Sequence, residues 1–359
     1  ELARCTNTVL EDSDLTAGSI SRLDTLFEDI VGYGREKDWR GDNKILKSGI
    51  ALSAKTAAGC LMDFNRTQVF LRGLKDAIKE AQKRFPGQKI RVLYAGSGPF
   101  GTLATPLTSQ FSPDEVEFTA LEIQEISIDC LKKVIKALGV ENYFANVIKT
   151  DATKYQHKGP RPHIIVTETM NKALMWEPHA AITANLESQM EEGGIFVPEE
   201  VSISLFLSPS DNDTDELGFG RKDIGEVAGL RRDSRLGADK RFVFDPAKYL
   251  YESHGVYLAT EVHVFGKHVL TDKDRSCITD PLYCGTVFNG SAFRSMVVRY
   301  NYGDPLVLRV EEGENKDGTR DIYVLGKGKK AGELEQNGNG FMNRLRRFMN
   351  GLNSDFLAR

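Results

Sequence analysis

The chain has 359 residues, of which 40% are hydrophobic and 27% are charged, and its formal net charge is −4. This composition is typical of a folded protein, and the length suits two domains or one large domain with an appendage. The slightly acidic balance argues against nucleic acid as a partner. No apolar run reaches the roughly 18 residues that cross a bilayer, and no signal-peptide pattern is present. We therefore expect a cytoplasmic protein without a membrane partner.

The cysteines are scattered and include no C-x-x-C pair; they are Cys5, Cys60, Cys130, Cys277 and Cys284. An odd number at irregular spacing favours reduced thiols over a disulfide framework. The six histidines do not combine with these cysteines at the spacing of zinc ligands. No metal site is expected.

The N-terminal part of the chain is predicted to be helical. Apolar residues recur at intervals of three, four and seven over residues 52–87, which predicts a long amphipathic helix. Ser53 is a suitable N-cap, and the Pro86-Gly87 pair would end the helix. We assign residues 1–87 to an N-terminal helical segment.

Short β-rich runs then alternate with helical patterns. The predicted strands are 90–96, 116–122, 143–149, 163–168 and a run that begins at residue 195. The predicted helices are 124–138, ended by Gly139, and 176–191, ended by Gly193-Gly194. This alternation predicts a mostly parallel sheet that is covered on both faces. Residues 88–199 are therefore expected to form a Rossmann-like α/β domain.

Beyond residue 200 the pattern changes to short strands between polar turns. An antiparallel β-barrel-like or sandwich domain is predicted for residues 200–330, interrupted by a polar loop over residues 208–240. Residues 331–359 are expected to form a flexible stretch and a C-terminal helix. The predicted fold class is thus α/β, with N-terminal helices and an added antiparallel β domain.

A glycine-rich turn directly follows the first predicted strand of the sheet. Gly96, Ser97, Gly98 and Gly101 belong to a G-x-G-x-x-G pattern, whose glycines let the backbone turn tightly beside a ligand. Glu122 ends the next strand, where a carboxylate can accept ribose hydroxyls. The pair predicts a nucleoside-containing cofactor. A dinucleotide site would show the same spacing, and a plain strand–turn–helix connection is the alternative without a ligand.

Two glutamates nine residues apart, Glu168 and Glu177, follow the fourth predicted strand. Two carboxylates brought together would repel one another unless a cation lies between them, and a guanidinium matches them best. Glu177 could instead be a solvated acid in the first turn of a helix. Arg66 could bind a ligand carboxylate, or it could be a surface arginine paired with Asp63 one turn earlier.

Three neighbours of the glutamate pair also have two interpretations. Trp176 and Met170 could line a cation–π wall or pack in the core. His179 could accept a proton or be a structural histidine. Core packing and a structural role are the readings that we prefer for these three residues.

Together these segments resemble the class I S-adenosylmethionine-dependent methyltransferases, and among them the protein arginine methyltransferase family. The resemblance covers roughly residues 48–200 and lies in LMDFNRT, VLYAGSGPFG, LEIQ and TETMNKALMWE. It implies S-adenosyl-L-methionine as cofactor and Glu168 and Glu177 as catalytic residues. It also implies the cofactor-binding residues Arg66, Gly96, Ser97, Gly98, Gly101, Glu122, Ile123, Asp151 and Ala152. Within this set Arg66 would bind the methionine carboxylate, Glu122 the ribose, and Asp151 the region of the adenine. A homodimer is implied as well, with an arm from residues 208–245.

The sequence departs from the family pattern at two points. Tyr94 replaces the acid that is usual in the first strand, and no Thr-His-Trp motif occurs in the chain. The missing motif favours a small guanidino or amino compound, such as arginine or a derivative, as the methyl acceptor. The alternative is a protein arginine methyltransferase. An NAD-dependent oxidoreductase and a non-catalytic cofactor-binding partner are the remaining hypotheses.

Overall fold

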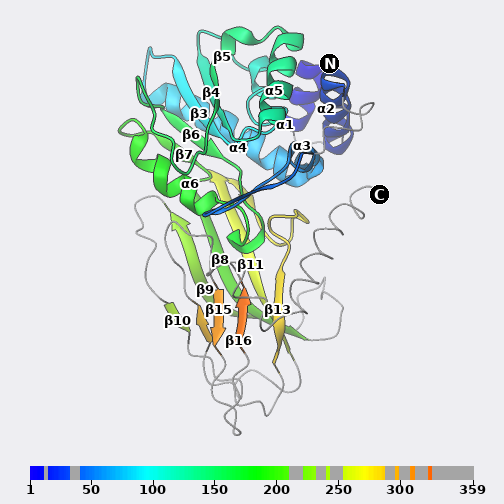
Figure 1. The fold of residues 1–359 in the computed structure, drawn as a ribbon, viewed down its shortest axis with the longest axis vertical. Helices are drawn as coiled ribbons and strands as arrows, with labels where there is room; N and C mark the ends of the chain where they lie inside the picture. Colours follow the sequence, from blue (N-terminus) through cyan, green and yellow to red (C-terminus); the bar gives the residue numbers. More distant parts are fainter. Residues whose placement is uncertain are drawn as a thin grey trace.

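The structure is a computed structural model that describes residues 1–11, 15–32, 41–209, 221–231, 240–242, 254–287, 296–298, 308–311 and 322–325. It places an α/β layer around a parallel sheet above a set of long antiparallel strands (Figure 1). The predicted fold class is confirmed by this arrangement. The prediction of a C-terminal helix in residues 331–359 lies outside the described residues, as does most of the arm predicted over residues 208–245.

The parallel sheet has five strands in the order β5-β4-β3-β6-β7. Their bounds are β3 Ile90–Ala95, β4 Val116–Glu122, β5 Phe144–Lys149, β6 Ile164–Thr167 and β7 Ile195–Val197. The chain winds outward from β3 to β5 and then crosses to β6 on the other side of β3. In such a sheet the strand order reverses between β3 and β6, and ligands bind at the carboxyl ends of the strands beside that point.

Helices cover both faces of this sheet. On one face, Val92, Ile164 and Val166 pack in the same core as apolar residues of α4 Phe64–Arg84. Ala120 on that face packs against α5 Glu125–Leu138, which ends at Gly139 in the left-handed conformation, as predicted. On the other face, Leu93 and Ile165 pack against α6 His179–Leu186. Buried side chains on both faces explain why these strands are nearly continuous hydrophobic runs.

The N-terminal segment is less regular than predicted. It contains α1 Leu2–Leu10, α2 Thr16–Val31, a hairpin of β1 Lys44–Leu46 and β2 Gly49–Ala51, α3 Ala54–Gly59 and α4. The expectation of one helix over residues 52–87 is wrong, because a 3₁₀ turn and Asp63 separate α3 from α4. Ser53 caps α3, accepting a hydrogen bond from the Thr56 N–H at 3.2 Å, whereas Asp63 caps α4 through the Arg66 N–H at 3.2 Å. Each helix thus has its own N-cap.

The antiparallel sheet has the strand order β12-β11-β8-β9, and β13 also pairs with β11. Its strands are β8 Glu200–Pro209, β9 Lys222–Arg231, β11 His254–Phe265, β12 His268–Leu270 and β13 Leu282–Val287. The predicted loop over residues 208–240 is wrong where β9 forms, because β9 pairs with β8 along its length. Two short antiparallel pairs complete the described strands: β10 Lys240–Phe242 with β14 Met296–Val298, and β15 Leu308–Glu311 with β16 Ile322–Leu325.

The helix predicted over residues 176–191 is also shorter in the structure. It begins at His179, after Pro178, and a 3₁₀ turn at Glu187–Gln189 follows its last residue, Leu186. Glu177 therefore precedes the helix instead of lying in its first turn. Proline fixes the backbone here and supplies no N–H, which suits the start of a helix.

One apolar core connects the two sheets. Buried residues of α4 share it with Val264 and Leu270 of the antiparallel sheet. The side chains of His268 and Asp76 also meet at 2.8 Å across this contact. No helix in the described ranges is long and apolar enough to cross a membrane. The cysteines whose side chains are described, Cys5, Cys60, Cys130 and Cys277, are free thiols.

Candidate functional site

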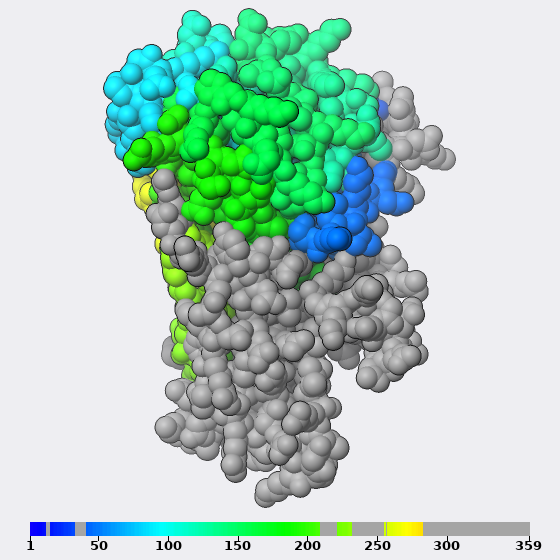
Figure 2. Space-filling view, turned by 60° about the vertical axis from the view of Figure 1, so that its left-hand side comes forward, coloured from blue at the N-terminus to red at the C-terminus, as the bar shows by residue number. Residues whose placement is uncertain are grey.

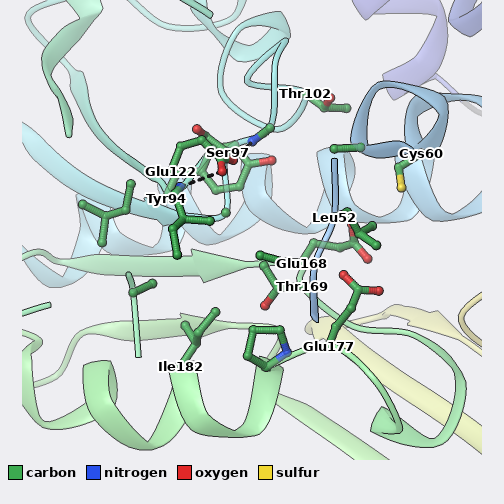
Figure 3. A pocket seen from close by; sticks show the side chains of 18 of the residues that line it. Leu52, Cys60, Tyr94, Ser97, Thr102, Glu122, Glu168, Thr169, Glu177 and Ile182 are labelled. Carbon is green, nitrogen blue, oxygen red and sulfur yellow. Dashed lines mark hydrogen bonds between the residues drawn. The ribbon is translucent and has the colours of Figure 1, made fainter. Parts of the chain in front are cut away.

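A pocket lies at the carboxyl ends of β3, β4 and β6, beside the point where the strand order reverses. Side chains from the glycine-rich turn, from the end of β4 and from the segment after β6 converge on it (Figure 3). The β1–β2 hairpin and the start of α4 supply further walls. The chain fold therefore brings together segments that lie far apart in sequence, from Leu46 to Ile182.

The glycine-rich turn after β3 lies against the segment that follows β6. Gly96 has a φ of +75°, and a Cβ there would collide with the side chain of Thr169. Both features require glycine. The Ser97 hydroxyl is buried and has no hydrogen-bond partner among the residues that the structure describes. A buried hydroxyl without a partner is costly, so a ligand that bonds to it would relieve this cost.

Glu122 is held by backbone donors at the end of β4. Its carboxylate accepts hydrogen bonds from the N–H groups of Gly98 at 2.9 Å, Ile123 at 2.6 Å and Gln124 at 2.8 Å. Burial raises the pKa of Glu122, and these three N–H groups act against that rise. A carboxylate has about four lone-pair sites, so three bonds leave room for a further donor from the pocket. Glu122 is thus a fixed acceptor beside the glycine-rich turn.

Asp151 follows β5 on the same side of the pocket. Its carboxylate accepts hydrogen bonds from the Thr153 N–H at 3.0 Å and the Thr153 hydroxyl at 2.6 Å. The ammonium of Lys154 lies 3.5 Å from its second oxygen. These contacts fix the turn in which Asp151 and Ala152 line the pocket.

Arg66 is buried at the start of α4, with only 4% of its surface exposed. Its guanidinium donates to a carboxylate oxygen of Glu168 at 3.3 Å and to the carbonyl of Cys60. Its Nε lies 3.9 Å from Asp63. The interpretation of Arg66 as a surface arginine is therefore wrong. Asp63 also accepts hydrogen bonds from the Ser276 hydroxyl at 2.8 Å and the Cys277 N–H at 2.9 Å, so the antiparallel sheet's β12–β13 connection contacts this wall.

The carboxylates of Glu168 and Glu177 face the same part of the pocket (Figure 3). Burial raises the pKa of Glu168 to about 7; Arg66 acts against the rise and Asp63 adds to it. Burial also raises the pKa of Glu177 to about 8, and the charge of Glu168 adds to that shift. Among the described residues, the cation Arg66 thus faces two half-buried acids. A second cation between the carboxylates would favour the ionised form of both.

Most residues predicted for the site do meet in this pocket. The residues that line it are Arg66, Gly96, Ser97, Gly98, Glu122, Ile123, Asp151, Ala152, Glu168 and Glu177. Gly101 is not among the lining residues; it is enclosed by Leu131 and the hydroxyl of Thr105. The functional roles of these residues stay predictions.

The other candidates lie outside the pocket. Met170 is buried in the apolar core, and Trp176 packs against that core. His179 is buried near a second, very small cavity, and burial lowers its pKa to about 3. It is therefore neutral over the ordinary pH range.

Several lining residues were not found from the sequence. They include Leu46, Ile50 and Leu52 of the hairpin segment, and also Cys60, Tyr94, Thr102, Thr150, Thr169 and Ile182. The hairpin strands are three residues long and carry no alternating pattern that would have signalled them. Tyr94 is a strand residue whose side chain is 4% exposed, and burial raises its pKa.

Comparison with known proteins was made by sequence and by structure. No protein-family profile matches the chain, and no curated protein matches it. Among solved structures, one similar fold is the Trypanosoma brucei PRMT1 enzyme–prozyme heterotetrameric complex with AdoHcy. The TM-score is 0.47 and the identity 12%, over 74% of this chain and 96% of that one. Another is Arabidopsis thaliana protein arginine methyltransferase 10 in an open conformation, with a TM-score of 0.43 and 11% identity over 71% and 93%. At these identities the similarity concerns the fold alone.

Proposed function

We propose that the chain is an S-adenosyl-L-methionine-dependent N-methyltransferase whose acceptor is a guanidinium group. The observation that carries this proposal is the placement of Glu168 and Glu177 in the same pocket as Glu122 and the glycine-rich turn. The carboxylates of Glu168 and Glu177 suit a cationic group, whereas Glu122 and the glycine-rich turn suit a nucleoside. A site that holds a cationic acceptor next to a nucleoside-containing methyl donor favours transfer of the methyl group from the donor to the acceptor.

The residues present fit this cofactor. Glu122 has room for a ribose hydroxyl, and the Ser97 hydroxyl lacks a partner in the described part of the chain. Arg66 would bind the carboxylate of the cofactor, and Asp151 would lie near its adenine. The sulfonium of the bound cofactor would supply the methyl group. Arg66 would then exchange its contact with Glu168 for the cofactor carboxylate, which frees Glu168 for the acceptor.

Glu168 and Glu177 would orient the acceptor by hydrogen bonds to its nitrogens. Two carboxylates match the planar donor edges of a guanidinium and would direct one nitrogen toward the glycine-rich turn. Their raised pKa values bring the ionised and protonated forms of both acids close in energy near neutral pH. Either carboxylate is therefore suited to accept the proton that the nitrogen loses on methylation.

The size of the acceptor is a separate matter. The small-molecule acceptor expected from the missing Thr-His-Trp motif gains no support from the described residues. The two solved structures above carry the alternative, protein arginine methyltransferase, in their names. Arginine-containing peptides are therefore the first acceptors to test, with free arginine beside them. An NAD-dependent oxidoreductase would use Glu122 but would leave the half-buried pair of Glu168 and Glu177 without a role. The homodimer and its arm over residues 208–245 stay predictions.

The test of this function is the variant Glu168→Gln. It keeps the size of the side chain and removes its charge, so we expect methyl transfer to fall by about a hundredfold or more. The affinity for S-adenosylhomocysteine should stay within about threefold, because this acid faces the acceptor. Methylated product would be measured by mass spectrometry on arginine-rich peptides and free arginine. The exposed Glu192→Gln is the matched control. Full activity of Glu168→Gln would exclude the proposed role.

A further inference from the structure

The β1–β2 hairpin runs between two walls of the pocket. Figure 1 shows its two dark-blue strands passing from the side of α3 toward α6. Leu46, Ile50 and Ala51 of the hairpin line the pocket, whereas Ile45, the cross-strand partner of Ile50, is 74% exposed. In the space-filling view the hairpin forms part of the outer surface beside the α/β layer (Figure 2). The hairpin therefore forms one wall of the pocket and is in part exposed to solvent.

One end of the hairpin segment is bonded to the cofactor side of the pocket. The Lys44 ammonium donates to the carbonyl of Ile123 at 2.6 Å. The Gln124 side-chain amide donates to the carbonyls of Asp42 at 3.2 Å and Leu52 at 3.0 Å, one on each side of the hairpin. Ile123 and Gln124 are also the residues whose N–H groups bind Glu122. The turn that fixes Glu122 thus also fixes the hairpin.

The other end of the hairpin lies directly against the segment that carries Glu177. The Ile50 N–H donates to the carbonyl of Trp176 at 2.7 Å. Gly49 has a φ of +144°, and a Cβ there would lie 2.6 Å from the Trp176 carbonyl oxygen and 3.0 Å from the backbone of Glu177 and Pro178. Side chains do not approach a backbone that closely, so only glycine permits this contact.

We propose that the β1–β2 hairpin is a positioning element that fixes Glu177 in the pocket relative to Glu122, with Gly49 and Gln124 as the positioning residues at its two ends. Glu177 precedes α6. On either side of it, the Pro178 carbonyl accepts from the Ile182 N–H at 2.9 Å and the Trp176 N–H donates to the Asn171 side chain at 3.0 Å. The bond from Ile50 and the backbone contact of Gly49 add to these bonds and hold the segment against the hairpin. The role of Glu177 toward a guanidinium rests on the proposed function, but the contact that places it does not.

Burial beneath the hairpin also explains why the pKa of Glu177 is raised. The groups that act on its carboxylate are the acid Glu168 and the cation Arg66, and the Cys60 thiol shares the same surroundings. Burial is the largest cause of its raised pKa. If the hairpin moves away, water reaches the carboxylate and the pKa of Glu177 should fall toward its ordinary value. The titration of Glu177 thus reports on the hairpin without any need for methyl transfer.

The test compares Gly49→Ala with Gly87→Ala in the full chain. Gly87 also has a positive φ, +75°, but apart from its two chain neighbours no described residue has an atom within 4 Å of the position of its Cβ. Both variants force alanine into the left-handed region, and only the first collides with the Trp176 carbonyl. Glutamate carboxyls would be followed by ¹³C NMR from pH 4 to 10, with Glu177 identified by the loss of its signal in Glu177→Gln. We expect the pKa of Glu177, about 8 in the wild type, to fall by one unit or more in Gly49→Ala and to stay unchanged in Gly87→Ala.

A second variant keeps the proposal testable if Gly49→Ala does not fold. Gln124→Leu removes both bonds to the hairpin from the opposite wall, so it should lower the pKa of Glu177 in the same direction. An unchanged titration in a folded Gly49→Ala, an equal shift in Gly87→Ala, or an unshifted Gln124→Leu would each overturn the proposal. Wild-type protein that does not bind S-adenosylhomocysteine would contradict the proposed function and leave this result standing.

Discussion

The carboxylates of Glu168 and Glu177 lie in a part of the pocket where water solvates their charges poorly. In the described ranges, the cation that acts on both is Arg66, which bonds to Glu168 at 3.3 Å. Glu177 has no such bond and has the higher pKa, about 8 against about 7. The folded chain therefore holds protons at this pair more tightly than the unfolded chain does. Two carboxylates arranged in this way lower the free energy of unfolding at alkaline pH, and they also form a binding site for a cation.

The pH dependence of stability follows from the sign of these shifts. A raised pKa in the folded state contributes stability that is fully present below the unfolded value, 4.5, and is lost as pH rises toward 8. Glu177→Gln removes this dependence. We therefore expect the variant, relative to wild type, to gain roughly 1–3 kcal/mol in the free energy of unfolding between pH 5 and pH 8.5. Urea unfolding without ligand at both pH values would measure this gain. The exposed Glu192→Gln should show none, and parallel pH curves for Glu177→Gln and wild type would contradict the account.

Among the elements, those with a strong local pattern were predicted and those that depend on distant contacts were not. The strand at 90–95 and the helix at 125–138 carry continuous or periodic apolar runs, and the sequence alone predicts them. The break between α3 and α4 depends on Asp63, whose carboxylate bonds to Ser276 and Cys277, more than 200 residues away in sequence. No local pattern signals such a partner.

The missed β1–β2 hairpin and the missed strand β9 have the same explanation. Each strand of the β1–β2 hairpin has three residues, and the hairpin is held by Lys44, Ile50 and Gln124 contacts to other parts of the chain. β9 contains two glycines and several charged residues, and it becomes a strand by pairing with β8. Edge strands of this kind are weakly specified by their own sequence.

The contact of α4 with β11 gives a prediction at this scale. Gly73 of α4 lies against Val264, whose Cγ1 would be 2.5 Å from an added Cβ. Alanine normally favours a helix over glycine, but here we expect Gly73→Ala to lower the free energy of unfolding by about 1–3 kcal/mol through overpacking. Gly18 in α2 has no atom within 4 Å of its Cβ position, so Gly18→Ala should gain up to about 1 kcal/mol. Chemical unfolding of both variants measures the difference, and equal stabilities would contradict the packing described.

Across the whole molecule, α4 links the two sheets and also carries part of the pocket. Its buried face joins the core that both sheets share, and its first turn presents Arg66. The sequence predicted the two kinds of sheet, and the domain boundaries at residues 87, 199 and 330 stay predictions. The pocket's ribose-side acid and acidic pair could be predicted because they follow strands of one parallel sheet. The hairpin that covers them could not, because its place depends on the folded chain.

The central claim is that this pocket binds the nucleoside and amino-acid parts of S-adenosylmethionine. Isothermal titration of the wild-type protein with S-adenosylhomocysteine, and with NAD for comparison, tests it most directly. We predict micromolar binding of S-adenosylhomocysteine, weakened in Arg66→Met, and no binding of NAD. Binding of NAD alone, or S-adenosylhomocysteine affinity that is indifferent to Arg66, would contradict the account.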